Sequence, residues 1–109
     1  MRLSSDTVIS IEKMANYLLT WRAENDKSRF LGLAGYTEND ADRLAADIRH
    51  QLLTLDAEFE ETTLYGDVYM IVGLLTGPNG RELRVTTVWM IEKSTLQTKF
   101  ITLYPAKEE

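Results

Sequence analysis

Two long β-type segments joined by a strong turn signal constrain this chain more than any other feature. The turn is Gly77-Pro78-Asn79-Gly80, and the flanking segments, residues 68–76 and 81–91, are rich in β-branched and aromatic side chains. Gly and Asn supply the unusual backbone angles of a tight turn, and Pro fixes its entry. We therefore expect an antiparallel hairpin at the centre of a sheet.

Two further segments, residues 59–64 and 98–104, have the pattern of strands, and Pro105 follows the second. We expect Thr76 to lie opposite Arg81 across the turn. Successive side chains of a strand point to opposite faces, so this register predicts which residues face the core. They are Val68, Met70, Val72, Leu74, Leu83, Val85, Thr87 and Trp89.

Helical spacing dominates the residues before the sheet. Ser10 can cap a first helix, the polar run at residues 24–26 ends it, and a second helix is predicted over 27–34, closed by Gly35. The apolar stripe of the first helix consists of Ile11, Met14, Ala15 and Leu18, widened by Tyr17 and Trp21.

A third helix has the clearest amphipathic pattern. Thr37 and Asp40 approximate a capping box before it. Its stripe consists of Ala41, Leu44, Ala45, Ile48, Leu52 and Leu55. The element order thus predicts an α+β fold in one domain over residues 1–109: three N-terminal helices packed on one face of a four-stranded, mainly antiparallel sheet.

Composition narrows the class of protein. The 109 residues include no cysteine, which excludes a disulfide scaffold, a thiolate metal site and a cysteine nucleophile. No segment approaches the roughly 20 apolar residues that span a bilayer, so we expect a cytoplasmic protein without membrane contact. The net charge of −5 opposes nonspecific attraction to nucleic acid but allows a local basic pocket. No metal or other cofactor is indicated, and the acidic run Glu58, Glu60 and Glu61 is interpreted as a solvated strand edge.

The sheet face away from the helices is expected to carry the function. In the predicted register Arg84 lies opposite Gly73 on this face, where an Arg beside bare backbone could hold a phosphate or a carboxylate. A β-bulge at Gly73 with a solvated Arg84 is the alternative. The same face would also carry Ile71, Leu75, Val88 and Met90, which favours a homodimer through it.

Motifs spread over nearly the whole chain support a family resemblance. They are IEKM at 11–14, YLL at 17–19, KSRF at 27–30, LAGY at 33–36, YG at 65–66, GPNGR at 77–81, TVW at 87–89 and TLYP at 102–105. With these motifs the chain resembles a family of small bacterial domains of unknown function, which occur alone and at the C-terminal ends of toxin-like and phage head proteins. That resemblance implies a layout similar to barnase-like and colicin-like RNases, as a fold analogy. The chain departs from the family pattern at Thr98-Lys99, where Pro-Arg is expected, and a Lys lacks the planar fork of an Arg.

Two function classes remain open. The first is a metal-independent, toxin-type RNase, which needs a base, an acid and a cation for the phosphate. Its candidate catalytic residues are Lys27, Arg84, Thr86, Thr102 and Tyr104. His50 is predicted to face solvent, and Lys27 lies on the apolar side of its helix, where it either serves the site or covers the core edge with its stem.

The second class is a noncatalytic module that binds a protein partner, immunity-like or antitoxin-like, or a structural dimer domain. The net negative charge and the half-apolar outer face of the sheet favour this second class. The family resemblance, which extends over nearly the whole chain, favours the nuclease.

Overall fold

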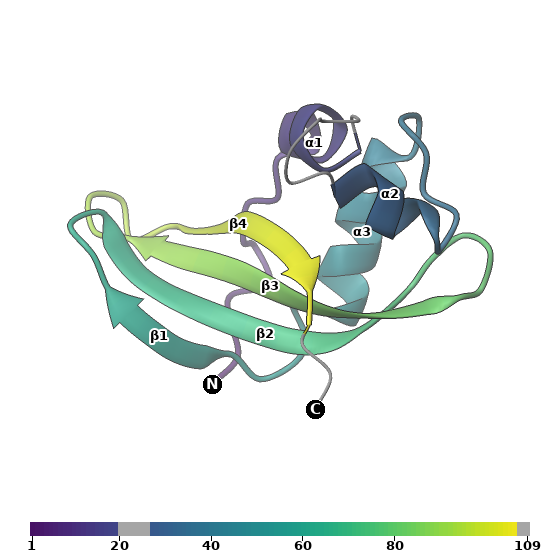
Figure 1. Cartoon of the computed structure of the whole chain (residues 1–109). Coiled ribbons are helices and arrows are strands. Elements are labelled where there is room, and N and C mark those ends of the chain that lie inside the picture. Colours follow the sequence, from purple (N-terminus) through teal and green to yellow (C-terminus); the bar gives the residue numbers. More distant parts are fainter. Residues whose placement is uncertain (20–26, 107–109) are drawn as a thin grey trace.

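The sheet is a four-stranded antiparallel meander, and each strand pairs with the next along the chain (Figure 1). The computed structural model describes residues 1–19 and 27–106. The strands are β1 (Glu58–Thr62), β2 (Gly66–Thr76), β3 (Glu82–Glu92) and β4 (Thr98–Pro105). The predicted antiparallel sheet and the α+β class are confirmed.

The helical elements are α1 (Ile11–Lys13), η1 (Met14–Leu18), α2 (Lys27–Gly32) and α3 (Ala41–Gln51). Ser10 caps α1 as predicted, since its side chain accepts a hydrogen bond from the Lys13 backbone at 3.2 Å. The chain then widens into the π-helical turn η1, closed by a hydrogen bond from the Leu19 nitrogen to the Met14 carbonyl. Ile11, predicted to be buried, is 44% exposed, whereas Met14 and Leu18 are fully buried.

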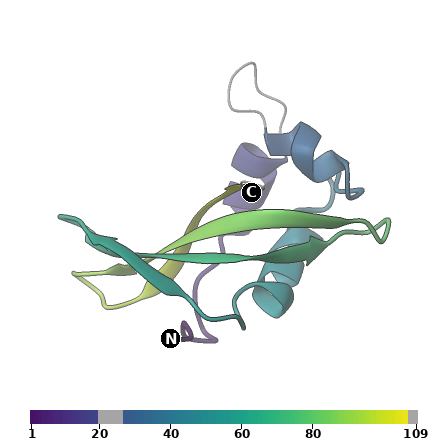
Figure 2. The ribbon, with the colours of Figure 1, turned by 60° about the horizontal axis from the view of Figure 1, so that its bottom comes forward.

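The helical elements differ in how closely they approach the sheet, although buried side chains of η1, α2 and α3 share one core with it. α3 lies against β2, whereas α2 packs on η1, and both α1 and η1 contact α3. Figures 1 and 2 show α1 beside the β4 side of the sheet rather than across its face. The predicted Trp21 and the polar break at 24–26 lie outside the described residues.

The third helix begins later than the capping-box pattern implies. Asp40, not Thr37, is the residue preceding its first turn, and the Asp40 carboxylate accepts hydrogen bonds from the Thr37 nitrogen at 2.8 Å and hydroxyl at 2.9 Å. The reach-back half of a capping box is therefore present, one turn early. Leu44, Ala45, Ile48 and Leu52 are buried as expected, but Leu55 is half exposed because the helix has already ended.

The register of the central hairpin differs from the prediction by one residue. Thr76 pairs with Glu82 instead of Arg81, so Leu75 lies opposite Leu83 and Gly73 opposite Val85. A slip of one residue moves every side chain of one strand to the other face. The core face of β2 therefore carries Tyr69, Ile71, Gly73 and Leu75, while the predicted core residues Val68, Met70, Val72 and Leu74 lie on the outer face.

The β3 half of the prediction is confirmed, because Trp89 is completely buried on the helix-covered face. Its ring meets Phe100 edge to face with centroids 5.2 Å apart. The Trp89 indole nitrogen donates to the Thr87 hydroxyl at 2.7 Å, and Thr87 donates in turn to the Ile71 carbonyl at 2.9 Å. The indole nitrogen and the Thr87 hydroxyl are thus both satisfied inside the core.

The hairpin tip is fastened to the segment that follows α2. The Asn79 nitrogen donates to the Ala34 carbonyl at 3.1 Å, and the Asn79 side-chain amide donates to the Leu33 carbonyl at 3.1 Å. Gly77 lies so close to Ala34 that its backbone fits only without a side chain. Gly35, at φ 94°, closes the α2 region in the left-handed conformation expected from the sequence.

The N-terminal segment extends the sheet at β4. Val8 forms a parallel bridge with Lys99, with the Val8 nitrogen donating to the Thr98 carbonyl at 2.9 Å and the Phe100 nitrogen donating to the Val8 carbonyl at 2.8 Å. This bridge covers part of the β4 edge and leads the chain directly into α1. It places the residues of α1 and η1 next to β4.

Candidate functional site

Two of the predicted site residues, Lys27 at the start of α2 and Thr102 in β4, meet although 75 positions separate them. The Lys27 ammonium donates to the Thr102 hydroxyl at 3.0 Å and to the Tyr17 hydroxyl at 3.1 Å. The same ammonium lies 4.8 Å from the centroid of the Tyr17 ring. Three elements, η1, α2 and β4, therefore supply one polar cluster.

A second lysine ammonium lies beside Tyr17. The Lys13 ammonium, one turn before Tyr17, lies 5.6 Å from the ring centroid, within the range of a cation–π contact. Lys99 in β4 is near enough for its charge to act on Lys13, and it also pairs with Glu92 at 3.3 Å. We call Lys13, Tyr17, Lys27 and Thr102 the Tyr17 cluster.

The charges of the cluster change the acidities of its members. A hydrogen bond from Thr102, followed by one from Lys27, lowers the pKa of Tyr17, because both donors stabilise the phenolate. Partial burial lowers the pKa of Lys13, and the neighbouring ammonium groups of Lys99 and Lys27 add to the effect. Acidity shifts of this kind are common at functional sites.

The other three predicted residues form a row on the neighbouring strands. Thr86 pairs with Tyr104, and Val88 with Thr102, so by register these side chains share the face of the sheet opposite Trp89. Thr86 is buried, Tyr104 half-buried and Arg84 exposed. The row leads from Arg84 toward Thr102, but no contact joins Arg84 to the Tyr17 cluster among the described residues.

Arg84 was predicted to bind a phosphate because it would lie opposite Gly73, and this position is wrong. Arg84 pairs with Leu74, not with Gly73. Gly73 faces the segment that follows α3, where a Cβ would lie 2.6 Å from Leu55 and 3.0 Å from Leu52, so the glycine makes room for these two leucine side chains. The Arg84 guanidinium therefore does not lie beside the backbone of Gly73. Lys27 is better placed than Arg84 to supply the cation of the site.

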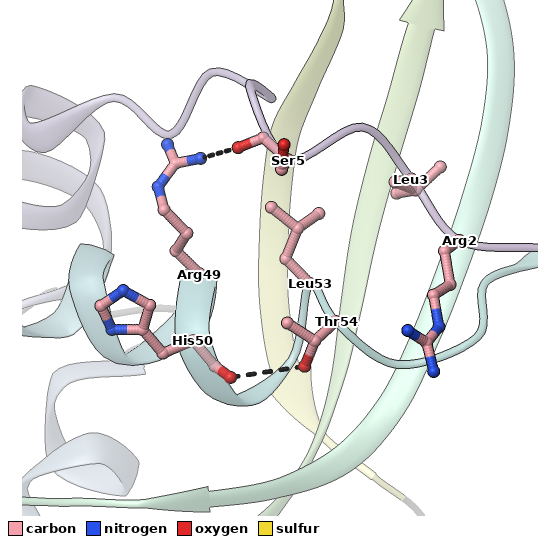
Figure 3. Close-up of a pocket in the computed structure, with 7 residues that line it drawn as sticks. All are labelled: Arg2, Leu3, Ser5, Arg49, His50, Leu53 and Thr54. Atoms are coloured by element: carbon pink, nitrogen blue, oxygen red, sulfur yellow. Dashed lines mark hydrogen bonds between the residues drawn. The ribbon is translucent and has the colours of Figure 1, made fainter.

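A separate pocket of about 340 Å³ lies between the N-terminal segment and the end of α3 (Figure 3). The Arg49 guanidinium donates to the carbonyls of Ser5 and Thr7, each at 2.8 Å. These bonds hold the N-terminal segment to α3. His50 is exposed at the rim, as the sequence predicts. We interpret the pocket as a by-product of this attachment, because Arg49 is already engaged by backbone.

The acidic run lies beside apolar residues of β2. Glu58 and Glu60 line a small pocket with Asp56, Met70 and Val72. Within residues 1–19 and 27–106, no grouping of His, Asp and Glu could hold a metal ion. In the same ranges, no helix is long and apolar enough to cross a bilayer.

Lys27 and Thr102 are among the site residues predicted from the sequence, whereas Tyr17 was predicted to lie on the apolar stripe of the first helix. The available signal was Lys13 four positions before Tyr17, since residues at that spacing meet on one helix face. The proximity of β4 had no sequence signal, because it depends on the bridge between Val8 and Lys99.

These features define the protein class as a small α+β domain with a meander sheet and a lysine–tyrosine cluster at its β4 side. The chain belongs to the family described as a domain of unknown function (DUF6883), which matches residues 4–107. None of the curated proteins matches it.

A solved structure with the same fold is a chain described as "Contact-dependent growth inhibition toxin - immunity protein complex from Klebsiella pneumoniae 342". The two chains are 19% identical, with a TM-score of 0.57, and the match covers 95% of this chain and 97% of that chain.

Proposed function

We propose that this domain is a metal-independent, RNase-like domain of the toxin type. The observation that carries the proposal is the meeting of Lys27, Thr102 and Tyr17, which supplies a cation and a proton-transfer group in one half-buried place. The likeness to a chain of a toxin–immunity complex agrees with such a role, although at that identity it concerns the fold.

The chemistry needs no metal. Attack of a ribose 2′-hydroxyl on the adjacent phosphorus forms a cyclic phosphate and breaks the bond from phosphorus to the 5′-oxygen of the next nucleotide. One group must take the hydroxyl proton, a second must give a proton to the leaving 5′-oxygen, and a cation must stabilise the developing charge. Lys27 is the proposed cation, and the phenols of Tyr17 and Tyr104 are the proposed proton-transfer groups. Thr86, Thr102 and Arg84 are proposed to hold the RNA strand next to Lys27 and the two phenols.

The test is cleavage of mixed cellular RNA by purified protein in EDTA. Lys27→Gln is expected to lower the rate about 100-fold or more, the typical loss when one charge-stabilising donor is removed. Lys93→Gln, an exposed lysine in the β3–β4 turn, is the matched control and is expected to cleave at the wild-type rate.

Melting curves of each variant separate lost chemistry from lost structure. Absence of cleavage by the wild-type protein would remove the nuclease function for these RNAs. Equal rates for the wild type and Lys27→Gln would remove Lys27 from the site.

A second candidate, a protein-binding module or a structural dimer domain, has its own support in the outer sheet face. Val72 and Leu74 are 49% and 52% exposed, beside the half-buried Met70, Val88 and Met90. An apolar face of this kind gains free energy when a partner covers it. The predicted dimer contacts Ile71 and Leu75 are wrong, because both side chains are buried in the core.

Sedimentation at micromolar concentration tests the dimer form of this candidate. Leu74→Lys is expected to convert a dimer into the 12.5 kDa monomer. Leu33→Lys, at an exposed leucine after α2, is the control and should leave the dimer intact. A wild-type protein that sediments only as the monomer removes the homodimer.

A further inference from the structure

The Tyr17 cluster concentrates positive charge in a chain that is acidic as a whole. The ammonium groups of Lys13 and Lys27 both lie over the ring of Tyr17, at 5.6 and 4.8 Å from its centroid. Among the described residues neither ammonium has a carboxylate within ion-pair distance, whereas Lys99 pairs with Glu92 at 3.3 Å. The net charge of −5 makes this local imbalance the more unusual.

Holding two ammonium groups together in a half-buried place raises the free energy of the folded state. Like charges repel, and burial removes part of the water that would screen them. The lowered pKa of Lys13 is the expected response to both effects. Such an arrangement is relieved when an anion binds, because the anion opposes both charges at once.

The cluster also presents two hydroxyl groups at the same place. The Tyr17 hydroxyl and the Thr102 hydroxyl each accept a hydrogen bond from Lys27, so both oxygens lie next to the same ammonium group. Hydroxyl protons can turn toward an incoming oxygen anion. Two ammonium groups and two hydroxyl groups together match a phosphate group, which offers charge and several acceptor oxygens.

We propose that the Tyr17 cluster binds a phosphate group of an RNA strand, with Lys13 and Lys27 opposing its charge and the Tyr17 and Thr102 hydroxyls donating to its oxygens. This inference deepens the proposed function, because it assigns the substrate's phosphate to one place and adds Lys13 and Tyr17 to the site. It concerns binding alone and is tested without cleavage.

The probe is a fluorescein-labelled 2′-O-methyl oligoribonucleotide, which lacks the attacking hydroxyl and stays intact. Fluorescence anisotropy at low salt is expected to show binding that weakens about tenfold for Lys13→Gln and again for Lys27→Gln, as for the loss of a charged hydrogen bond. Lys93→Gln should bind as the wild type does. Tyr17→Phe keeps the ring beneath the lysines and removes only the hydroxyl, so it is expected to fold normally and bind more weakly.

Inorganic phosphate serves as a competitor and tests whether the cluster binds the phosphate group of an RNA strand or only free phosphate. Displacement of the oligonucleotide by millimolar phosphate, with backbone NMR shifts at Tyr17 and Lys27, supports the site. Phosphate shifts at the cluster without any oligonucleotide binding would overturn the assignment to an RNA strand.

Oligonucleotide binding that is equal for Lys13→Gln, Lys27→Gln and Lys93→Gln would overturn the site itself. These outcomes are separate from the cleavage test. Binding at the cluster without RNA cleavage removes the proposed activity and keeps the site, whereas cleavage with unaltered binding in the lysine variants keeps the activity and removes the site.

Discussion

Replacing Gly77 by alanine should destabilise the protein far more than the same change at Gly80, although both glycines belong to one turn. A Cβ at Gly77 would meet the carbonyl oxygen of Ala34 and would lie 2.5 Å from the Ala34 Cβ and 2.9 Å from its carbonyl carbon. These atoms are backbone or fixed to it, so no side-chain rotation relieves the clash. The hairpin tip must move away from Ala34 instead.

The expected loss follows from two contributions. Overpacking of this kind costs about 1–3 kcal/mol. Moving the tip also breaks the hydrogen bond from the Asn79 nitrogen to the Ala34 carbonyl, worth about 0.5–1.5 kcal/mol. Together they predict a loss of about 1.5–4.5 kcal/mol, which for a domain of this size lowers Tm by about 6 °C or more.

Gly80 is the matched control. Its φ is 84°, but a Cβ there would meet nothing within 4 Å. Only the left-handed backbone then opposes alanine, at about 1 kcal/mol, part of which the stiffer unfolded chain offsets. Urea denaturation of both variants measures the difference, and a Gly77→Ala protein as stable as Gly80→Ala would refute the close packing of the turn on Ala34.

Three other predictions concern the core, the register and a buried phenol. Trp89→Ala should cost about 3–5 kcal/mol in urea denaturation, because a fully buried ring and its contact with Phe100 are lost, whereas Trp89→Phe should cost less; equal losses would contradict this packing. Leu75→Lys should lower stability by more than about 4 kcal/mol because Leu75 is buried, whereas Leu74→Lys should lower it by less than about 0.5 kcal/mol because Leu74 is exposed. Thermal melts that give the reverse order would support the register predicted from the sequence. Burial, with the hydrogen bond to Asp47 at 2.6 Å, raises the pKa of Tyr36, so the unfolded chain loses this proton at lower pH than the folded protein. The stability from Tyr36 is therefore complete below about pH 10 and declines above it, and Tyr36→Phe should flatten that decline; a wild-type stability that does not change between about pH 9 and pH 11 would contradict the prediction.

The strand positions were predictable because their residues and turn have strong local signals, but the register was not. Both alternating sets of β2 contain large apolar residues, Met70 and Leu74 on one and Ile71 and Leu75 on the other. Period-two patterning cannot choose between two such sets. The choice depends on the turn, where the Gly77 nitrogen donates to the Arg81 carbonyl and leaves Arg81 outside the paired strands.

The candidate site was predictable in its parts but not in its assembly. Lys27 was identifiable because a charged residue lies on the apolar side of a short helix, and Thr102 because it lies in the closing strand. Their meeting depends on how α2 and β4 are brought together across 75 positions, which no local pattern contains. Tyr17 was missed because an aromatic residue at helical spacing is typical of a core position.

The distance along the chain between Lys27 and Thr102 has a consequence for synthesis on the ribosome. Tyr17 and Lys27 are made before β4, which supplies Thr102 together with the buried Phe100 and Leu103 and is made after the other three strands of the sheet. A nascent chain that ends before residue 98 therefore lacks both part of the core and one side of the cluster. If the cluster is the active centre, this domain is inert until β4 has been made and has docked against β3.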